Sequence, residues 1–314
     1  MKRALVLTLL IAAGASSTLL VARAQPRPEA IQIEKVKDGL YLITGGRGTG
    51  SQVGSVAGNT TVFIAAKGVV LIDTKFAGLG KAILEQVKSV TNKPVTTIIN
   101  THTHGDHTGG NGDFGAGVEF VAHENTRANM ARMDDFKGAN AAFLPKKTYK
   151  DSLSLLDGTD RIDLHYFGAG HTNGDTVIVF PAARTAVLGD LFARKWAPLI
   201  DAANGGSALA YPQTLARVLT GVRNVDTVIT GHSTTTTGTG QAATFVRSAP
   251  IRPWADLQEY ADFMREFVAA AQAAKKAGKS VDEAAKSLTL PDKYKSYNLD
   301  RAKEDIQRVY DETK

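Results

Sequence analysis

Histidines concentrate in one short stretch of the sequence, residues 100–111, which reads Asn-Thr-His-Thr-His-Gly-Asp-His-Thr-Gly-Gly-Asn. Three of the seven histidines in the 314-residue chain fall here, His102, His104 and His107, together with Asp106. Imidazole nitrogens and carboxylate oxygens are ligands that suit zinc and its neighbours in the metal series. The stretch therefore predicts a metal site rather than an ordinary polar turn.

The element that must position these histidines is a short apolar run directly before them. Residues 95–100 predict a buried strand that ends where the histidines begin. Side chains two residues apart at a strand end point to the same side, so His102 and His104 are expected to converge. Asp106 and His107 can turn toward a second point nearby. The sequence thus favours two adjacent sites.

Three further candidate ligands lie just outside expected strands, and each directly follows a glycine. They are His171, before a strand expected at 176–180, Asp190, after one at 185–188, and His232, after one at 225–230. Glycine lets the backbone approach a shared centre closely. With the histidine stretch, these residues predict two metal sites and a bridging ligand. The remaining histidines, His123 and His165, lack such a setting and are expected to be structural or at the surface.

Short β-branched runs separated by glycine-rich turns fill residues 31–74 and predict an antiparallel meander. The expected strands are 31–36, 40–44, 60–66 and 69–73. The glycine-rich segment 45–58 lacks the Lys-Ser/Thr of a phosphate-binding loop. We expect it to form a mobile hairpin or a flap over the site. Further along, the pattern predicts helices at 78–90 and 125–133, and strands at 118–122, 153–157 and 162–167.

After Ser248 the pattern becomes helical. Apolar residues spaced three and four apart from Trp254 to Ala271 predict an amphipathic helix, residues 280–283 read as a capping box, and 301–310 predict a third helix. We expect these helices to pack on the main domain, with a homodimer contact as a secondary role. The expected organisation is a signal peptide over 1–24, a main domain over 25–248 and a helical extension over 249–314.

The first 24 residues have the pattern of an export signal. Lys2 and Arg3 precede an apolar run, and Ala22-Arg23-Ala24 offers a small-x-small cleavage site. We expect cleavage before Gln25, and hence a periplasmic or secreted protein without a membrane attachment. A membrane anchor is the alternative, although the apolar run is short for one.

Composition narrows the function further. The chain contains no cysteine, which excludes disulfides, a thiol nucleophile and thiolate ligands. Apart from the three basic residues of the signal region, 34 basic residues stand against 31 acidic ones, and they are scattered. No nucleic-acid partner is therefore expected. A small-molecule substrate is expected instead.

With these residues assembled, the chain resembles the metallo-β-lactamase superfamily over about residues 31–235. Five motifs occur in the family's order: Asp73 at a strand end, His102-Thr103-His104-Gly105-Asp106-His107, His171, Asp190 and His232. The resemblance implies an α/β (α+β) fold, a four-layer αββα sandwich with metals at the edge between two sheets. Here it would carry a helical C-terminal extension.

The resemblance also implies how the ligands divide. His102, His104 and His171 would hold one zinc ion, Asp106, His107 and His232 a second, and Asp190 would bridge the two, with Asp73 in a supporting part. The lactamase class with a cysteine in the second site is excluded, and diiron relatives place Glu where His104 stands. Asp190 as the bridge resembles the broader hydrolase branches, which include thioester hydrolases, lactonases and phosphodiesterases.

The implied activity is that of an exported binuclear zinc hydrolase acting on a small ester, thioester, lactone or amide, β-lactams included. Water between two cations reaches a pKa of about 7, so a metal-bridging hydroxide would attack, with Asp106 the catalytic carboxylate. A phosphodiesterase and a non-catalytic periplasmic metal- or ligand-binding protein are the alternatives. Arg194, Lys195 and Trp196 follow Asp190 and either line the substrate pocket or form a surface loop.

Overall fold

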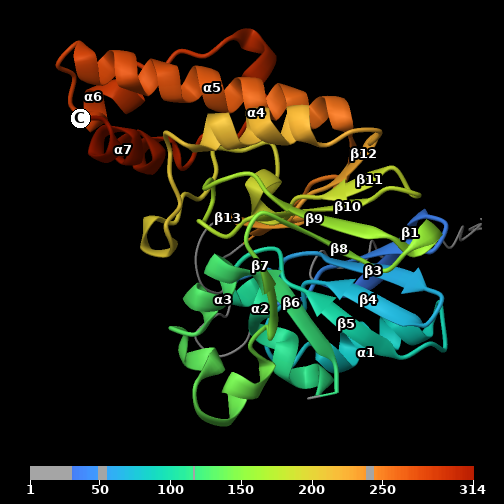
Figure 1. Cartoon of the computed structure of the whole chain (residues 1–314). Coiled ribbons are helices and arrows are strands. Elements are labelled where there is room, and N and C mark those ends of the chain that lie inside the picture. The colour runs from blue at the N-terminus through green and yellow to red at the C-terminus, as the bar shows by residue number, and fades with distance from the viewer. Residues whose placement is uncertain (1–29, 49–54, 116, 238–243) are drawn as a thin grey trace, which may run out of the picture.

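Two β-sheets lie face to face, and helices cover the outer face of each (Figure 1). The computed structural model describes residues 30–48, 55–115, 117–237 and 244–314. The expected signal peptide and residues 49–54 of the glycine-rich segment lie outside the described residues. The expected αββα sandwich with C-terminal helices is confirmed.

The first sheet has seven strands in the order β1-β2-β3-β4-β5-β6-β7. These strands are β1 Gln32–Lys37, β2 Leu40–Thr44, β3 Thr60–Ala65, β4 Gly68–Ile72, β5 Val95–Ile99, β6 Glu119–His123 and β7 Lys147–Tyr149. The first four form the expected antiparallel meander, and β5, β6 and β7 continue it in parallel. Parallel strands end at the same edge of a sheet, so Asp73 after β4 and the histidine stretch after β5 lie side by side.

The second sheet has six strands in the order β15-β12-β11-β10-β9-β8. These are β8 Ser152–Leu155, β9 Ile162–Tyr166, β10 Thr176–Phe180, β11 Thr185–Val187, β12 Thr227–Ile229 and β15 Ile251–Pro253. Because β10 runs antiparallel to β11, and β11 parallel to β12, the start of β10 and the ends of β11 and β12 share one edge. His171, Asp190 and His232 therefore belong to that edge.

Apolar side chains from both sheets form the central core. Leu42 and Ile99 of the first sheet and Ile178 of the second belong to it, and the rings of Phe63 and Phe180 lie 5.0 Å apart. Each such side chain contributes about 1.5–3 kcal/mol by burial. This core fixes the position of one sheet against the other, and with it the two edges that carry the candidate ligands.

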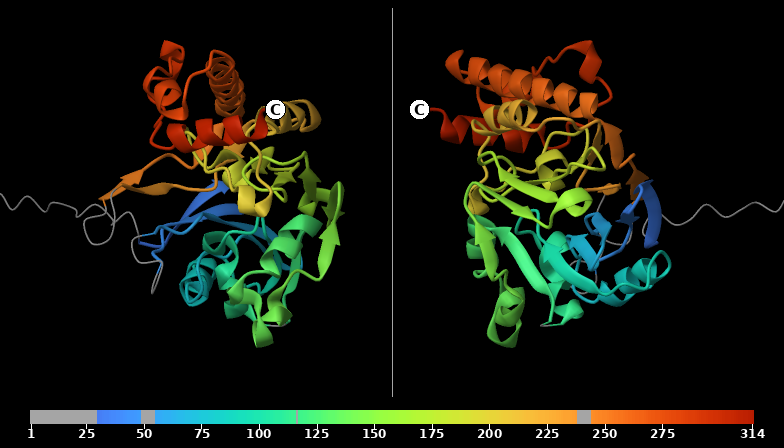
Figure 2. Two further views of the ribbon diagram at one scale, coloured as in Figure 1. Left: turned by 90° about the vertical axis from the view of Figure 1, so that its left-hand side faces the viewer. Right: turned by 45° about the vertical axis from the view of Figure 1, so that its right-hand side comes forward.

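Helices occupy both outer layers. They are α1 Gly80–Lys88, α2 Gly105–Thr108, α3 Glu124–Met130, α4 Tyr211–Gly221, α5 Trp254–Lys276, α6 Val281–Lys286 and α7 Ala302–Glu312. Helix α1 packs Ile83 and Val87 on the first sheet, while α4 and α5 cover the second (Figure 2). No helix in the described part of the chain is apolar enough over a sufficient length to cross a membrane.

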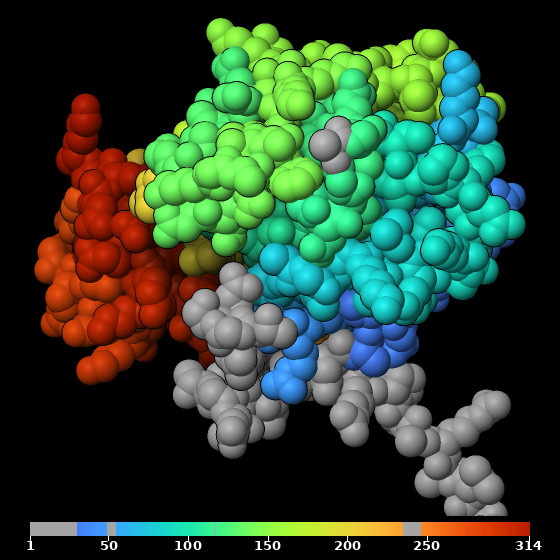
Figure 3. Space-filling model, turned by 90° about the horizontal axis from the view of Figure 1, so that it is seen from below, coloured from blue at the N-terminus to red at the C-terminus, as the bar shows by residue number. Residues whose placement is uncertain are grey.

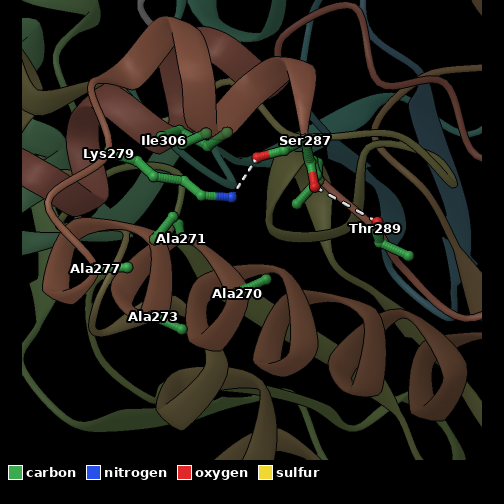
Figure 4. Close-up of a pocket in the computed structure, with 11 residues that line it drawn as sticks. Ala270, Ala271, Ala273, Ala277, Lys279, Ser287, Thr289 and Ile306 are labelled. Carbon is green, nitrogen blue, oxygen red and sulfur yellow. Dashed lines mark hydrogen bonds between the residues drawn. The ribbon is translucent and has the colours of Figure 1, made fainter.

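The C-terminal helices form a lobe on one side of the molecule, orange to red in Figure 3. The capping box expected at residues 280–283 begins α6, where Ser280 and Glu283 bond each other's backbone N–H groups. A shallow groove of about 330 Å³ lies between α5 and the segments that follow it, lined largely by alanines of α5 (Figure 4). The Lys279 ammonium donates to the Ser287 hydroxyl at 2.8 Å across it.

Several elements differ from the sequence-based expectations. Helix α4 was not expected, nor were β7, β15 and the ribbon of β13 Thr234–Thr237 with β14 Thr244–Arg247. The residues directly after His104, for which no helix was expected, form α2. Helix α3 ends at Met130 rather than at residue 133, since the chain turns there into 3-10 geometry that buries Phe136 beside Met130.

Candidate metal centre

Seven side chains from the two sheet edges converge on one region. Three groups have ligand atoms within 4.8 Å of one another: His102, His104 and His171; His102, His107 and Asp190; and Asp106, His107 and His232. His104 Nδ1 lies 2.9 Å from His171 Nε2, and His107 Nε2 lies 3.3 Å from His232 Nε2. Two nitrogens on one tetrahedral zinc, each at about 2.0–2.1 Å from it, are separated by about 3.3 Å. The spacing therefore fits shared ions.

The aspartates lie between the two histidine pairs. Oδ2 of Asp190 is 3.3 Å from His232 Nε2 and 3.8 Å from His171 Nε2. Oδ1 of the same carboxylate is 3.4 Å from His107 Nε2. Oδ2 of Asp106 lies 3.3 Å from His232 Nε2. Asp190 is therefore placed where a bridging ligand would stand, and Asp106 faces the second group.

Each of four imidazoles has its outer nitrogen engaged by an acceptor. Oδ2 of Asp201 is 2.7 Å from His104 Nε2, and the Leu199 carbonyl is 2.6 Å from His171 Nδ1. Oδ2 of Asp73 is 2.8 Å from His107 Nδ1 and also accepts the Thr101 hydroxyl, which is itself 3.0 Å from His102 Nδ1. These acceptors fix the proton on the outer nitrogen and leave the inner lone pair for a metal.

Two buried atoms at the centre are unsatisfied. Nε2 of His102 and Oδ1 of Asp190 have no hydrogen-bond partner among the described residues. A buried polar atom left without a partner costs about 1–3 kcal/mol. A metal ion would satisfy both atoms, and the donor set of imidazole and carboxylate suits zinc. The residues present therefore fit the metal that their chemistry implies.

The electrostatics of the centre favour added positive charge. Burial opposes ionisation of Asp106, but His107 and His232 outweigh it and lower the pKa of this carboxyl to about 2. Burial likewise opposes the charged form of His107, yet Asp106, Asp190 and Asp73 hold its pKa well above the usual range. Burial lowers the pKa of His171 to about 4. The carboxylates thus attract cations to a centre in which His171 stays neutral, as a ligand must.

Glycines admit the backbone to the centre, as the sequence predicted. A Cβ at Gly231 would lie 2.0 Å from Asp190 Oδ1, and one at Gly58 would lie 2.3 Å from His107 Cε1. Gly189 adopts a φ of +51°, a left-handed conformation, with Thr101 directly against it. Gly58 belongs to the glycine-rich segment, so the described end of that segment packs on the metal centre.

Sequence reasoning missed Asp201 and Lys75. Asp201 has no motif around it, and only the fold brings it to His104. Lys75 is fully buried and donates to the carbonyls of Ile43, at 3.1 Å, and Gly58, at 2.6 Å. Burial lowers its pKa to about 7. Through its hydrogen bond to the Gly58 carbonyl, Lys75 anchors the residue that packs on His107.

The two remaining histidines lie outside the candidate metal groups of the described residues. His123 caps α3 through the Asn125 N–H and stacks on Tyr166 at 4.1 Å. His165 lies in β9 and belongs to none of the metal groups formed by the described residues.

The three residues predicted either to line the substrate pocket or to form a surface loop contact the C-terminal lobe or one another. Lys195 Nζ lies 3.1 Å from the carboxylates of both Asp256 and Glu259 in α5. The Arg194 guanidinium stacks 4.7 Å from the Trp196 ring centroid. A role in substrate binding stays a prediction for all three.

Comparisons with known proteins identify the family to which the chain belongs. The model of the Metallo-beta-lactamase superfamily matches residues 27–232. A metallo-beta-lactamase type 2 of Bacillus sp. (strain 170) is 24% identical over 186 residues, 57% of this chain and 67% of that protein. The 2,4-dinitroanisole O-demethylase subunit alpha of Nocardioides sp. (strain JS1661) is 32% identical over 128 residues, 39% of this chain and 38% of that subunit. The solved structure of a metallo-beta-lactamase from Pontibacter korlensis, 20% identical, covers 75% of this chain and 99% of its own, with a TM-score of 0.59.

The chain belongs to the metallo-β-lactamase superfamily, as its motifs predicted. It is a hydrolase of this superfamily, and its described residues include groups of His and Asp that could hold the metal on which such zinc-dependent hydrolases rely. The family match ends at His232, so α5, α6 and α7 lie beyond it.

Proposed function

We propose that the chain is a binuclear zinc hydrolase of a small ester, thioester, lactone or amide, β-lactams included. The observation that carries this proposal is the convergence of seven donor side chains into overlapping metal-binding groups. His102, His104 and His171 would hold one ion, Asp106, His107 and His232 the other, and Asp190 would lie between them. The relatives named for β-lactam hydrolysis support the inclusion of β-lactams.

Zinc at these groups would supply Lewis acidity and a water molecule whose pKa is about 7. The protein residues prepare that chemistry. Asp201, the Leu199 carbonyl and Asp73 keep protons on the outer imidazole nitrogens, and the ionised carboxylate of Asp106 is 22% exposed, where it can orient a water molecule. Orienting that water molecule is the catalytic role proposed for Asp106.

The exposed fractions of the side chains show which side of the centre is open to solvent. The side chains of His104 and Asp106 are 20% and 22% exposed, whereas those of His107 and His171 are at most 1% exposed. A substrate would therefore approach from the side of His104 and Asp106. The buried side excludes water and strengthens every charge interaction there.

Metal analysis and a substrate panel test the proposal. Purified protein should contain close to two zinc ions per chain and hydrolyse at least one of an ester, a lactone, a thioester and a β-lactam. The His102→Ala, His104→Ala double variant should lose turnover together with zinc from the first group. Full activity in a metal-free preparation would refute the assignment. Cleavage of a phosphodiester alone would favour the phosphodiesterase alternative, and zinc binding without any turnover would favour the binding protein.

We also propose export, which rests on the sequence of residues 1–24. The mature protein should begin at Gln25 when its N-terminus is sequenced from a periplasmic or culture fraction.

A further inference from the structure

The last residue of α7 contacts the segment that precedes α4. The Glu312 carboxylate accepts the Ser207 hydroxyl at 2.6 Å and the backbone N–H groups of Ala208 and Leu209 at 2.8 and 3.0 Å. Three hydrogen bonds to one carboxylate fix residues 207–209 against the C-terminal lobe. Both partners lie in described parts of the chain, and α7 lies outside the family match.

These bonds lie in the turn that leads into α4. The N–H groups of Ala210, the N-cap residue, and of Tyr211 are accepted by the hydroxyl and the carbonyl of Ser207, both at 3.1 Å, and Glu312 holds that hydroxyl together with the N–H groups of the two residues between. A carboxylate is unfavourable at the C-terminal end of its own helix and favourable near the N-terminal end of another. The contacts of Glu312 are therefore explained by α4 rather than by α7.

The position of Glu312 is itself fixed. The Lys275 ammonium of α5 donates to the Tyr310 carbonyl at 2.6 Å and to the Thr313 carbonyl, on either side of Glu312. The end of α7 is thus tied to α5, whose Leu257, Phe263 and neighbours pack in the large core beneath it.

The segment that Glu312 holds is bonded to the first metal group. The Ser207 N–H donates to the Gly170 carbonyl at 3.0 Å, directly before His171. The Gly206 N–H donates to the Asp201 carbonyl at 2.8 Å, and the Asp201 N–H donates to the His171 carbonyl at 2.9 Å. Residues 206–207 therefore hold both His171 and the aspartate that orients His104.

The same helix start reaches the bridging position. The Tyr211 hydroxyl, in the first turn of α4, lies 3.1 Å from the backbone carbonyls of both Asp190 and Leu191. Tyr211 is fully buried, so its hydroxyl has little freedom to move. A shift at the start of α4 would pass to Asp190 as well as to Asp201.

We propose that Glu312 is a positioning residue for the first metal group. By fixing residues 207–209, it holds Asp201 and His171 in position. Asp201 in turn orients His104, so the inner nitrogens of His104 and His171 point to one position. The C-terminal lobe, which lies beyond the family match, thereby contributes to the metal centre. This proposal rests on the proposed function, since it requires a metal at that group.

The test compares Glu312→Ala and Glu312→Gln with Asp311→Ala, an exposed carboxylate one residue earlier on the same helix. Zinc affinity is measured by competition with a chromophoric chelator, and the geometry of the first group by the visible spectrum of protein loaded with cobalt(II). We expect Glu312→Ala to lower the affinity of one ion about tenfold and to change the cobalt spectrum. Glu312→Gln, which keeps an oxygen acceptor, should recover part of the loss, and Asp311→Ala should match wild type.

A purely structural role predicts a different result. It would lower the unfolding temperature of Glu312→Ala while leaving its zinc affinities and cobalt spectrum as in wild type, and that outcome would overturn the proposal. Lys275→Met releases the end of α7 without touching residues 207–209 and serves as the second variant if Glu312→Ala does not fold, with the same criterion. Wild-type protein that binds no zinc would overturn the proposed function itself, and this role with it.

Discussion

Gly58→Ala isolates one close contact in the metal centre. A Cβ at residue 58 would lie 2.3, 2.5 and 2.8 Å from Cε1, Nε2 and Nδ1 of His107. Carbon atoms pack at about 3.5–4.0 Å, so the imidazole or the backbone of residue 58 must move by about 1 Å. Gly58 does not adopt a positive φ, and the substitution therefore adds this overlap without a backbone penalty.

Neither partner can yield freely. His107 is fully buried and held through Nδ1 by Asp73, and Gly58 is held by Lys75 and by the carbonyl of Asp106. Overpacking of this kind costs about 1–3 kcal/mol of stability. A ligand moved from its place typically lowers metal affinity by about 10–100-fold. We expect that loss at the second ion, with the first ion retained.

The assay is a stepwise zinc titration against a chelator, with thermal unfolding of the metal-free protein alongside. Gly117→Ala is the matched control, because a Cβ there meets no atom within 4 Å and the residue does not adopt a positive φ. It should match wild type in both measurements. Two zinc ions bound to Gly58→Ala with wild-type affinity would refute the placement of His107 as a ligand of the second ion.

Two further predictions concern Asp201, which is partly exposed, and the buried carboxyl group of Asp305. Asp201→Asn removes the charge that orients His104, so the affinity for the first zinc ion should fall about 10–100-fold in a zinc titration. The metal-free protein should unfold near the wild-type temperature. An unchanged zinc affinity would exclude the orienting role. Burial raises the pKa of Asp305 to about 8, so its contribution to stability is complete below about pH 4 and is lost as the pH rises through about 8. Asp305→Asn should remove that dependence, which is about 6 kcal/mol over the whole range and about 3 kcal/mol between pH 6 and pH 9, where urea unfolding would measure it. An equal change of stability with pH in both proteins would contradict it.

The convergence of the candidate ligands could be predicted from the sequence because their signals are local. His102 and His104 follow a strand at a spacing of two, and His171, Asp190 and His232 each follow a glycine beside a strand. Local pattern places each residue at a strand end, and strand ends of neighbouring strands share an edge. The two sheet edges then bring the residues together.

The residues that the sequence did not predict depend on distant partners. Asp201 reaches His104 across 97 positions, and no helix or strand carries it there. The turn that leads into α4 is held by Glu312, which lies 103 positions from Leu209 in the sequence. A window of local sequence contains neither partner. Because these partners are distant in the sequence, a local pattern predicts neither helix α4 nor its link to the metal centre.

The metal centre also joins the two sheets. Its candidate ligands come from both edges: His102, His104, Asp106 and His107 from the first sheet and the other three from the second. Asn59 adds a direct link, since it donates to the carbonyls of Gly231 and Thr230 at 2.7 and 2.8 Å. An ion bound by both sheets stabilises the native sandwich over the unfolded chain, by about 2.7 kcal/mol when its free concentration is 100 times Kd. The sheet packing that forms the site and the ion that occupies it therefore reinforce each other, and the C-terminal helices contribute to both through the start of α4.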